Sequence, residues 1–194
     1  VPIRLGAELY GYAGTAADVE LICLMAQTLR SAGIPGAQIV LGHVGIFKAL
    51  VNEAELNAEA ETQLFEAVQR KAYDEIDFLL EKYVRDSASK QQFRELIRLS
   101  GDESVLVSAL EAFADASEAV TAELKELTDI VHGVKRRLGE SPLHFDLCEL
   151  RGYEYHTGIV FAAYINEYGR AVAKGGRYDH IGKAFGRARP ASGF

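Results

Sequence analysis

Cysteine is scarce in this sequence: only Cys23 and Cys148 occur among 194 residues. The two lie in segments of different character and lack the short spacing of a metal-binding pair. The simplest interpretation is that both are reduced thiols in a cytoplasmic protein. We expect no metal site and no cofactor.

Long apolar runs are also absent. No stretch approaches the roughly 20 residues that an apolar helix needs to cross a bilayer, and no signal peptide is visible at the start. The hydrophobic fraction of 48% and the mean hydropathy of −0.02 are those of an ordinary soluble globular protein. We therefore expect no membrane as a partner.

An excess of positive charge is missing too. The chain has 21 lysine and arginine residues against 28 aspartate and glutamate residues, which gives a formal net charge of −7. This balance argues against a general nucleic-acid binder, because nonspecific affinity comes from cationic neutralisation of phosphates. Lys183, Arg187 and Arg189 form one local basic group, which is suited either to a phosphorylated ligand or to a solvated or interface edge.

Glycine does not occur between Gly45 and Gly101, and acidic and basic residues alternate in this stretch. Apolar residues at helical spacing predict one long helix over residues 64–83, a second around residues 93–97 and a third over residues 105–113. The charged residues on the other faces are typical of a solvated surface.

The segments on either side of this helical block show strand and helix signals in turn. One helix is expected to have Thr15 as its N-cap, to place Asp18 in its first turn and to end at Gly33. Another is expected to open at Ser117 and to end before Gly139. Strands are predicted at residues 3–10, 38–43 and 143–148.

Two more strands are predicted near the end of the chain, at residues 155–164 and 171–174. They are joined by a turn at residues 166–169, where Gly169 can adopt the positive φ that a hairpin turn needs. A hairpin forces antiparallel pairing, so the order of elements predicts an α+β fold with an antiparallel sheet flanked by helices.

Polar groups crowd this hairpin and the segment before it. Arg151 and Arg177 have planar, permanently charged guanidinium groups that suit a carboxylate or a phosphate. Gly175 and Gly176 lack Cβ atoms, which lets a ligand or another backbone come close. Further hydrogen-bonding groups belong to Glu154, Tyr155, His156, Tyr178 and Asp179.

Two interpretations of this cluster stay open from the residues alone. A Gly-Gly pair in a strand can mark a β-bulge, and an arginine near an aspartate can form a structural ion pair. Polar groups that converge on a glycine-lined surface are also typical of a ligand site. His43, at the end of a predicted strand, is interpreted as a structural residue.

The same residues resemble a known family. The stretch R-G-Y-E-Y-H-T-G-I-V-F (residues 151–161) and the stretch G-G-R-Y-D (residues 175–179) resemble the two histidine-specific motifs of histidyl-tRNA synthetase, a class II aminoacyl-tRNA synthetase. Both motifs occur in the family's order, and the resemblance covers nearly the whole chain, most weakly in its middle third. The chain is still more similar to the non-aminoacylating paralogues of that enzyme, the regulatory subunits of ATP phosphoribosyltransferase.

Several positions depart from the synthetase pattern R-G-L-D-Y-Y-x-G-x-V-F-E. His156 replaces its second tyrosine, Glu154 replaces its aspartate and Ala162 replaces its last glutamate. Near the start of the chain, Glu8 retains the glutamate of the family's Q-x-G-x-E-x-x-G segment, whereas Arg4 replaces the glutamine. These departures favour a regulatory subunit over an active synthetase.

The resemblance implies a class II synthetase-like core that is interrupted by a helical insertion. The first part of the core would cover residues 1–50, the insertion residues 51–116 and the second part of the core residues 117–194. Because the family continues beyond both ends of this sequence, we expect the chain to be a fragment that lacks both ends of the core.

The resemblance also implies a histidine-like pocket without catalytic residues. A carboxylate is a suitable partner for an imidazole N–H, whereas the charge of an arginine would repel the ammonium group of an amino acid. The expected pocket residues are Glu8, Arg4, Arg151, Tyr155, His156, Gly175 and Gly176, with Arg177, Tyr178 and Asp179 as structural support.

The function implied is that of a non-catalytic regulatory subunit that acts in the first step of histidine biosynthesis. Its expected partners are the short-form catalytic subunit of ATP phosphoribosyltransferase, histidine as an effector, and other subunits in a homodimer or larger hetero-oligomer; tRNA is not expected. The alternatives are an active histidyl-tRNA synthetase, in which Arg151 would neutralise charge on the α-phosphate, and a synthetase-like module that binds another ligand.

Overall fold

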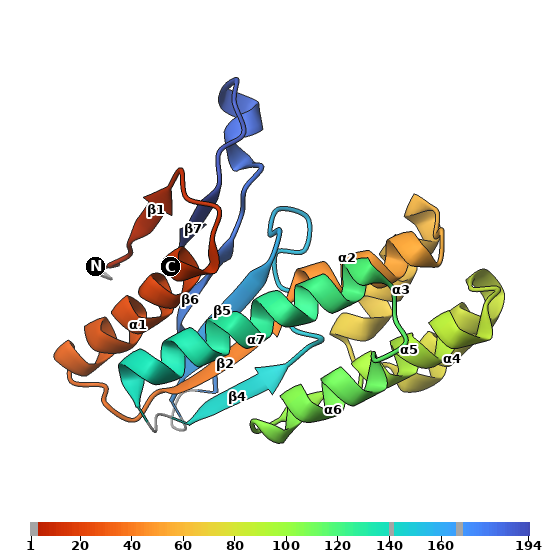
Figure 1. The fold of residues 1–194 in the computed structure, drawn as a ribbon, viewed down its shortest axis with the longest axis horizontal. Coiled ribbons are helices and arrows are strands. Elements are labelled where there is room, and N and C mark those ends of the chain that lie inside the picture. The colour runs from red at the N-terminus through yellow and green to blue at the C-terminus, as the bar shows by residue number, and fades with distance from the viewer. Residues whose placement is uncertain (1–3, 140–141, 166–168) are drawn as a thin grey trace.

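A mixed β-sheet forms the centre of the protein in the computed structural model, which describes residues 4–139, 142–165 and 169–194 (Figure 1). The strands lie in the order β1-β7-β6-β5-β2-β4-β3, so that the first and the last strand pair at one edge of the sheet. The strands are β1 (Glu8–Tyr10), β2 (Gln38–His43), β3 (Ser100–Gly101), β4 (Leu143–Asp146), β5 (Ile159–Tyr164), β6 (Ala171–Arg177) and β7 (Ala191–Gly193).

The predicted hairpin is formed by β5 and β6, which pair antiparallel with Val160 opposite Gly176. Gly169 has a φ of 58°, as the turn prediction requires, whereas residues 166–168 of that turn lie outside the described residues. The expectation of an antiparallel sheet needs correction at one pair, because β2 and β4 are parallel. The long helical crossover between these two strands returns the chain to the same end of the sheet, which makes parallel pairing possible.

The predicted strand boundaries hold to different degrees. β2 has the bounds that the sequence predicts, whereas β1 is limited to Glu8–Tyr10 and β5 starts only at Ile159. Residues 155–158 belong to the turns before β5, so the prediction of a strand over residues 155–164 is wrong for these four residues. β6 in contrast continues through both glycines to Arg177.

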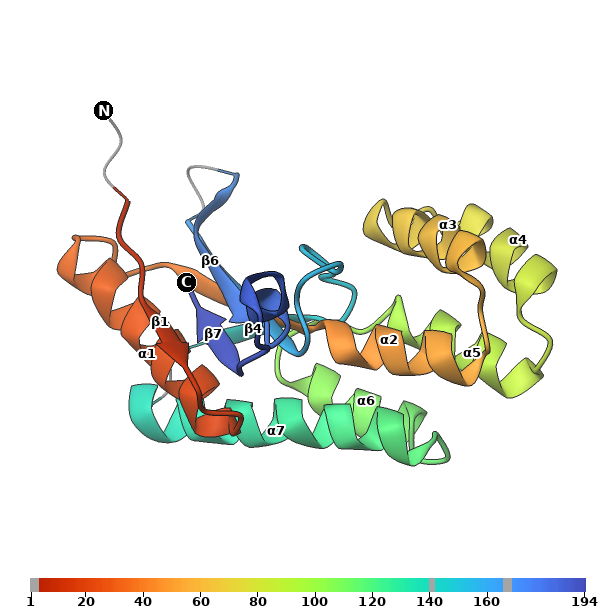
Figure 2. The ribbon, with the colours of Figure 1, turned by 90° about the horizontal axis from the view of Figure 1, so that it is seen from above.

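Helices α1 (Thr15–Ser31) and α7 (Glu118–Leu138) pack against each other on one side of the sheet (Figure 2). Ser117 caps α7 as predicted, since its hydroxyl accepts a hydrogen bond from the backbone N–H of Val120 at 3.4 Å. The prediction that Thr15 caps α1 is wrong. Gly14 is the N-cap and Thr15 is already helical, so no side chain caps this end.

The other helices form a group beyond one end of the strands (Figure 1). The helices predicted around residues 93–97 and over residues 105–113 are confirmed as α5 and α6. The sequence pattern does not predict α2, because apolar residues are buried on several sides of it and leave no polar stripe. The group comprises α2 (Val44–Glu53), α3 (Ala58–Gln69), α4 (Tyr73–Tyr83), α5 (Ser87–Leu96) and α6 (Ser104–Ala112).

The single long helix predicted over residues 64–83 is wrong, because the chain forms α3 and α4 with a break between them. At the break Lys71 has a φ of 52°, a left-handed conformation through which a right-handed helix cannot continue. The Nζ atom of Lys71 lies 2.7 Å from Asp146 at the end of β4. Apolar residues keep their helical spacing across the break, so periodicity alone does not reveal it.

One cluster of buried apolar residues joins the sheet, α1, α7 and the helical group. Ile22 and Met25 of α1, Leu41 of β2 and Phe47 of α2 belong to it and are fully buried. This continuity means that the helical group is packed onto the sheet and not merely tethered to it. Within the described residues, no helix is long and apolar enough to cross a membrane.

Gly133 of α7 lies close to Val19 of α1. A Cβ atom at this position would lie 2.6 Å from Cγ2 of Val19, a short β-branched side chain that cannot move aside freely. We expect Gly133→Ala to lower the free energy of unfolding of the complete protein by about 1–3 kcal/mol through overpacking, although alanine favours helices by about 1 kcal/mol. Urea denaturation measures the difference.

Gly36→Ala is the matched control, because no atom lies within 4 Å of a Cβ atom built there. It should change stability by less than about 0.5 kcal/mol. Equal stability of Gly133→Ala and the unaltered protein would contradict the close crossing of the two helices.

Candidate functional site

The loop of residues 147–158, between β4 and β5, carries most of the predicted site. It turns back on itself, since the backbone N–H of His156 donates to the carbonyl of Gly152 at 2.8 Å. Gly152 has a φ of 69°, and a Cβ atom there would meet Nδ1 of His156 at 2.7 Å. Only glycine fits this turn without strain, and the turn brings the residues on both sides of it together.

A cavity of about 220 Å³ opens between this loop and the β5–β6 hairpin. It brings together Arg151, Tyr155, His156 and Gly175 from the predicted pocket. Two charged residues that the sequence does not predict, Glu149 and Lys174, also line the cavity. Nothing in the sequence distinguishes them from solvated charges. The other lining residues are Gly152, Val160, Phe161 and Ala162.

Arg151 is held in place at the cavity by neighbouring side chains. Its Nε donates to Glu149 at 3.0 Å, and its Nη2 bonds to the other carboxylate oxygen of Glu149 and to the hydroxyl of Tyr164. The hydrogen bond with Glu149 raises the pKa of the Arg151 guanidinium further above its ordinary value. With 42% of its side chain exposed, this fixed positive charge can still receive an anionic group.

His156 is largely buried, with 8% of its surface exposed, and its ring lies between Tyr155 and Tyr178. Its Nδ1 lies 2.9 Å from the carbonyl oxygen of Arg151. Because a carbonyl can only accept, Nδ1 carries the proton in the neutral ring and Nε2 is an acceptor. Burial lowers the pKa of His156 below 6.5, which favours this neutral form at physiological pH.

The two glycines of β6 have different neighbours. A Cβ atom on Gly176 would lie 2.7 Å from Nε2 of His156, and one on Gly175 would meet the Phe161 ring at 2.4 Å. Gly175 lines the cavity, whereas the ring of His156 covers Gly176. Of the two glycines expected at the pocket, Gly175 thus lies at the cavity, whereas Gly176 makes room for a protein side chain.

Glu8 and Arg4 do not line this cavity. Glu8 is on β1 at the edge of the sheet, where its carboxylate accepts a hydrogen bond from Tyr10 and lies near Tyr178. Burial raises the pKa of Tyr178, so its phenol stays protonated beside that carboxylate.

Arg4 lines a separate cavity of about 960 Å³ next to α1, with Met25 among its neighbours. The expected repulsion between Arg4 and an ammonium group at the pocket has no geometric support.

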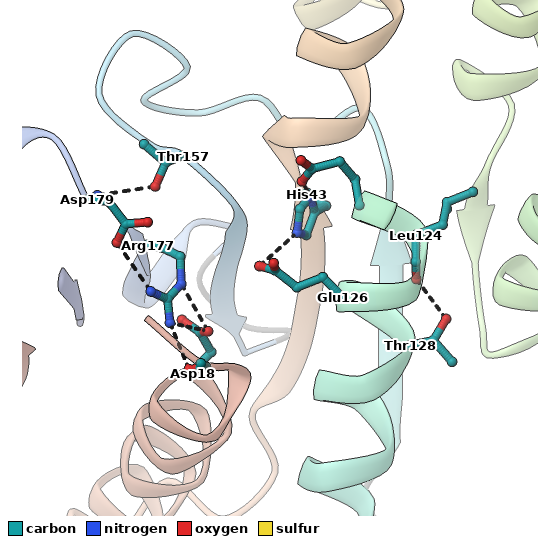
Figure 3. A network of polar contacts seen from close by, with 10 residues as sticks. Asp18, His43, Leu124, Glu126, Thr128, Thr157, Arg177 and Asp179 are labelled. Atoms are coloured by element: carbon teal, nitrogen blue, oxygen red, sulfur yellow. Dashed lines mark hydrogen bonds and ion pairs between the residues drawn. The ribbon is translucent and has the colours of Figure 1, made fainter. Parts of the chain in front are cut away.

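Arg177 is the centre of a buried ion-pair network that does not line the cavity (Figure 3). The expected pairing with Asp179 is present at 3.2 Å, but Asp18 of α1 lies closer, at 2.6 Å, and also accepts from Nε at 3.1 Å. Asp179 in turn accepts from the backbone N–H of Ala191 at 3.0 Å and donates its own N–H to Thr157 at 3.2 Å. The sequence does not reveal Asp18 as a partner of Arg177, because an acidic residue in a first helical turn is usually solvated.

In the Asp18–Arg177 pair two guanidinium N–H groups donate to one carboxylate oxygen, a geometry that favours the charged form of Asp18 although both side chains are almost completely buried. Burial raises the pKa of Asp18, and the bonds from Arg177 oppose this shift. The guanidinium itself cannot lose its proton in a protein. The pair therefore ties α1 to β6 by charge as well as by hydrogen bonds.

His43 is fully buried at the end of β2 (Figure 3). Its Nδ1 is 3.4 Å from Glu123 and its Nε2 is 3.5 Å from Glu126, both on α7. The contact with His43 lowers the pKa of Glu126, whereas burial raises the pKa of Glu123. His43 joins β2 to α7, which agrees with its interpretation as a structural residue.

The basic group of Lys183, Arg187 and Arg189 is exposed on the segment between β6 and β7. Arg187 and Arg189 line a shallow cavity of about 250 Å³ with Tyr10, separate from the one at Arg151. In the described part of the chain, no three or more histidine, cysteine, aspartate or glutamate side chains are grouped to hold a metal ion.

The architecture is that of a class II aminoacyl-tRNA synthetase-like core, in which a sheet carries helices on one face and a loop-covered cavity on the other. A crystal structure from Bacillus halodurans, described as an ATP phosphoribosyltransferase regulatory subunit/histidyl-tRNA synthetase, has a TM-score of 0.86 to this chain at 28% identity. The similarity covers 97% of this chain and 49% of that one. The sheet, the crossing helices and the loop therefore belong to one established fold.

The chain belongs to the histidyl-tRNA synthetase family, because the model of that family matches residues 1–194. A relative from Chromohalobacter salexigens, named ATP phosphoribosyltransferase regulatory subunit, is 49% identical over 193 residues, which cover 100% of this chain and 49% of the relative. The chain thus spans about half the length of the curated relatives it matches.

A similar fold occurs in a structure described as the ATP phosphoribosyl transferase (HisG:HisZ) complex from Thermotoga maritima. Its TM-score is 0.70 at 18% identity, and the match covers 97% of this chain and 63% of that chain. At this identity the comparison shows the fold alone.

Asp18→Asn should leave Arg177 buried without its principal counter-charge. We expect this change to lower the free energy of unfolding of the complete protein by about 3–5 kcal/mol, as is typical when one partner of a buried pair is removed. Urea denaturation at neutral pH measures it. Asp129→Asn is the control, because its ion pair with Lys125 on α7 is exposed and should contribute less than about 1 kcal/mol. Equal effects of the two substitutions would contradict the special role of Asp18.

His156 should make stability depend on pH. Its folded-state pKa is lowered by burial, so the unfolded chain binds the proton more readily and stability falls as the pH drops through 6.5. His156→Asn keeps a side-chain N–H for the carbonyl of Arg151 and cannot titrate. We expect the loss of urea stability between about pH 7.5 and about pH 5.5 to be smaller in this variant. His132→Asn on the exposed side of α7 should keep the original slope, and a His156→Asn slope like the original would disprove the assignment.

Proposed function

We propose that this chain is part of a regulatory subunit of ATP phosphoribosyltransferase, a protein without catalysis of its own that acts in the first step of histidine biosynthesis. The observation that carries the proposal is the identity of almost half of all residues, over the whole chain, with relatives of that name. The match covers 100% of the chain, so it includes the sheet and the helical group alike.

The cavity supports a small effector, and histidine is the effector we propose. Its volume of about 220 Å³ is below the roughly 300–1,000 Å³ of pockets for drug-sized ligands. Arg151 is suited to the carboxylate of an amino acid, and the acceptor nitrogen of His156 is suited to an imidazole N–H. We keep Tyr155 and Gly175 in the proposed pocket, and we leave out Glu8 and Arg4 because they lie elsewhere.

An active histidyl-tRNA synthetase is the second candidate, and the position of Arg151 at the cavity favours it. In the family pattern this arginine contacts the adenylate, where a positive charge would stabilise the phosphate. Two lining residues argue against this candidate. Ala162 stands where the pattern has a glutamate, which leaves the cavity with one carboxylate less, and His156 replaces a tyrosine.

The partners that we propose are the short-form catalytic subunit and further subunits in a homodimer or larger hetero-oligomer, with no role for tRNA. The name of the relatives, regulatory subunit of ATP phosphoribosyltransferase, supports a catalytic subunit as partner. We also propose a cytoplasmic location, which suits the two buried free thiols, Cys23 and Cys148.

Mixing the complete protein with a short-form catalytic subunit tests the proposal. We expect formation of phosphoribosyl-ATP to rise on mixing and to fall again when histidine is added, because histidine would favour one of two assembly states. The protein alone should show no histidine-dependent pyrophosphate exchange. A heat-treated sample is the control for both assays. Exchange above this control, without activation on mixing, would assign the chain to an active synthetase instead.

A further inference from the structure

Tyr153 lies in the middle of the loop that carries the cavity residues, but its side chain is directed into the helical group. It is 8% exposed and does not line the cavity, although Arg151 and Tyr155 on either side of it do. Its ring stacks on Phe65 of α3, with centroids 4.8 Å apart and planes at 25°. It also meets the edge of Phe47 of α2 at 5.4 Å and 81°. The loop is thus packed onto two helices at one residue.

The hydroxyl of Tyr153 adds a directional contact to this packing. It donates to Oε1 of Glu61 on α3 at 2.6 Å. Burial raises the pKa of Tyr153, which keeps the hydroxyl protonated and able to donate. A hydrogen bond to a carboxylate in a half-buried place contributes more than an exposed one and depends strongly on geometry.

Lys48 of α2 holds the same loop at a second point. Its Nζ donates to the backbone carbonyl of His156 at 2.6 Å and lies 4.8 Å from the centre of the Tyr153 ring. Burial lowers the pKa of Lys48, while Glu61 and Glu123 oppose this shift. The amine therefore lies between the loop, α3 and α7, and it contacts a residue whose side chain lines the cavity.

These contacts leave the loop little freedom to move alone. A ligand in the cavity would contact Arg151, Tyr155 and His156, and any displacement of these residues moves the backbone at positions 153 and 156. The backbone carbonyl of His156 is held by Lys48 of α2, and the side chain of Tyr153 is held by Glu61 of α3. Packed side chains transmit such displacements because the interior is dense and cannot absorb them.

We infer that Tyr153 and Lys48 couple occupancy of the cavity to α3, so that the helical group responds to the bound ligand. The inference rests on the proposed function in one respect, namely that the cavity binds histidine. It goes beyond that function because it gives the helical group a role in regulation. Lys48 and Tyr153 are positioning residues in this arrangement, since neither lines the cavity.

Hydrogen exchange of the complete protein with and without histidine tests the coupling. In the unaltered protein, histidine should slow exchange of the amides of α3 (Ala58–Gln69) by about 5-fold or more, as a coupling of at least 1 kcal/mol requires. Tyr153→Phe keeps the ring and removes only the hydrogen bond to Glu61, so histidine should still bind while the response of α3 becomes smaller. Lys48→Met keeps the apolar stem and should reduce the response in the same way.

Tyr83→Phe is the matched control. Tyr83 of α4 donates to Gln63 of α3 at 3.2 Å, so this variant also removes one tyrosine hydroxyl bonded to α3 but leaves the loop untouched. It should keep the full response to histidine. A response that is lost to the same extent in Tyr83→Phe would overturn the assignment to Tyr153, because it would show a general loosening of α3.

Calorimetric titration of the protein with histidine, run in parallel, separates the coupling to α3 from the proposed binding of histidine. Binding of histidine to the unaltered protein without a change in α3 exchange would overturn the coupling and leave the proposed function intact. The coupling would also be overturned if both Tyr153→Phe and Lys48→Met kept the full response. No binding of histidine would reject histidine as the effector, and the coupling with it.

Discussion

The buried ion pair between Asp18 and Arg177 is the constraint on which the arrangement of this protein depends. It joins α1 to β6 across 159 positions of sequence, and through Asp179 it also holds the backbone of β7. Two charges removed from water are tolerable only when each faces the other with good geometry. Because Arg177 lies at the end of the strand that carries both glycines, the pair also determines where the β5–β6 hairpin sits against the helices.

The loop between β4 and β5 depends on this frame and has two sides. One side presents Arg151, Tyr155 and His156 to a small cavity, and the other presents Tyr153 to α2 and α3. The tight turn at Gly152 makes this division possible, because it reverses the chain within a few residues. Sites on loops are usually more mobile than sites on helices or strands. Here α2 and α3 hold the loop through Tyr153 and His156.

Much of the fold can be predicted from the sequence where the signal is local. The bounds of β2, the cap at Ser117 and the turn at Gly169 follow from side-chain period and backbone preference, which act over a few residues. The break at Lys71 cannot be predicted in this way, since the apolar spacing continues through it and its partner Asp146 is far along the chain. The same reason explains why α2, which is apolar on several sides, gives no periodic signal.

The sequence by itself determined the two motifs at residues 151–161 and 175–179, and with them the family and the side chains available to a site. Only the tertiary structure decided how those side chains are used. It placed His156 over Gly176, moved Glu8 and Arg4 away from the cavity, and supplied Asp18 as the partner of Arg177. The physical reason is that a motif specifies chemistry and local backbone shape, whereas hydrogen bonds and ion pairs depend on distances between segments that meet only after folding.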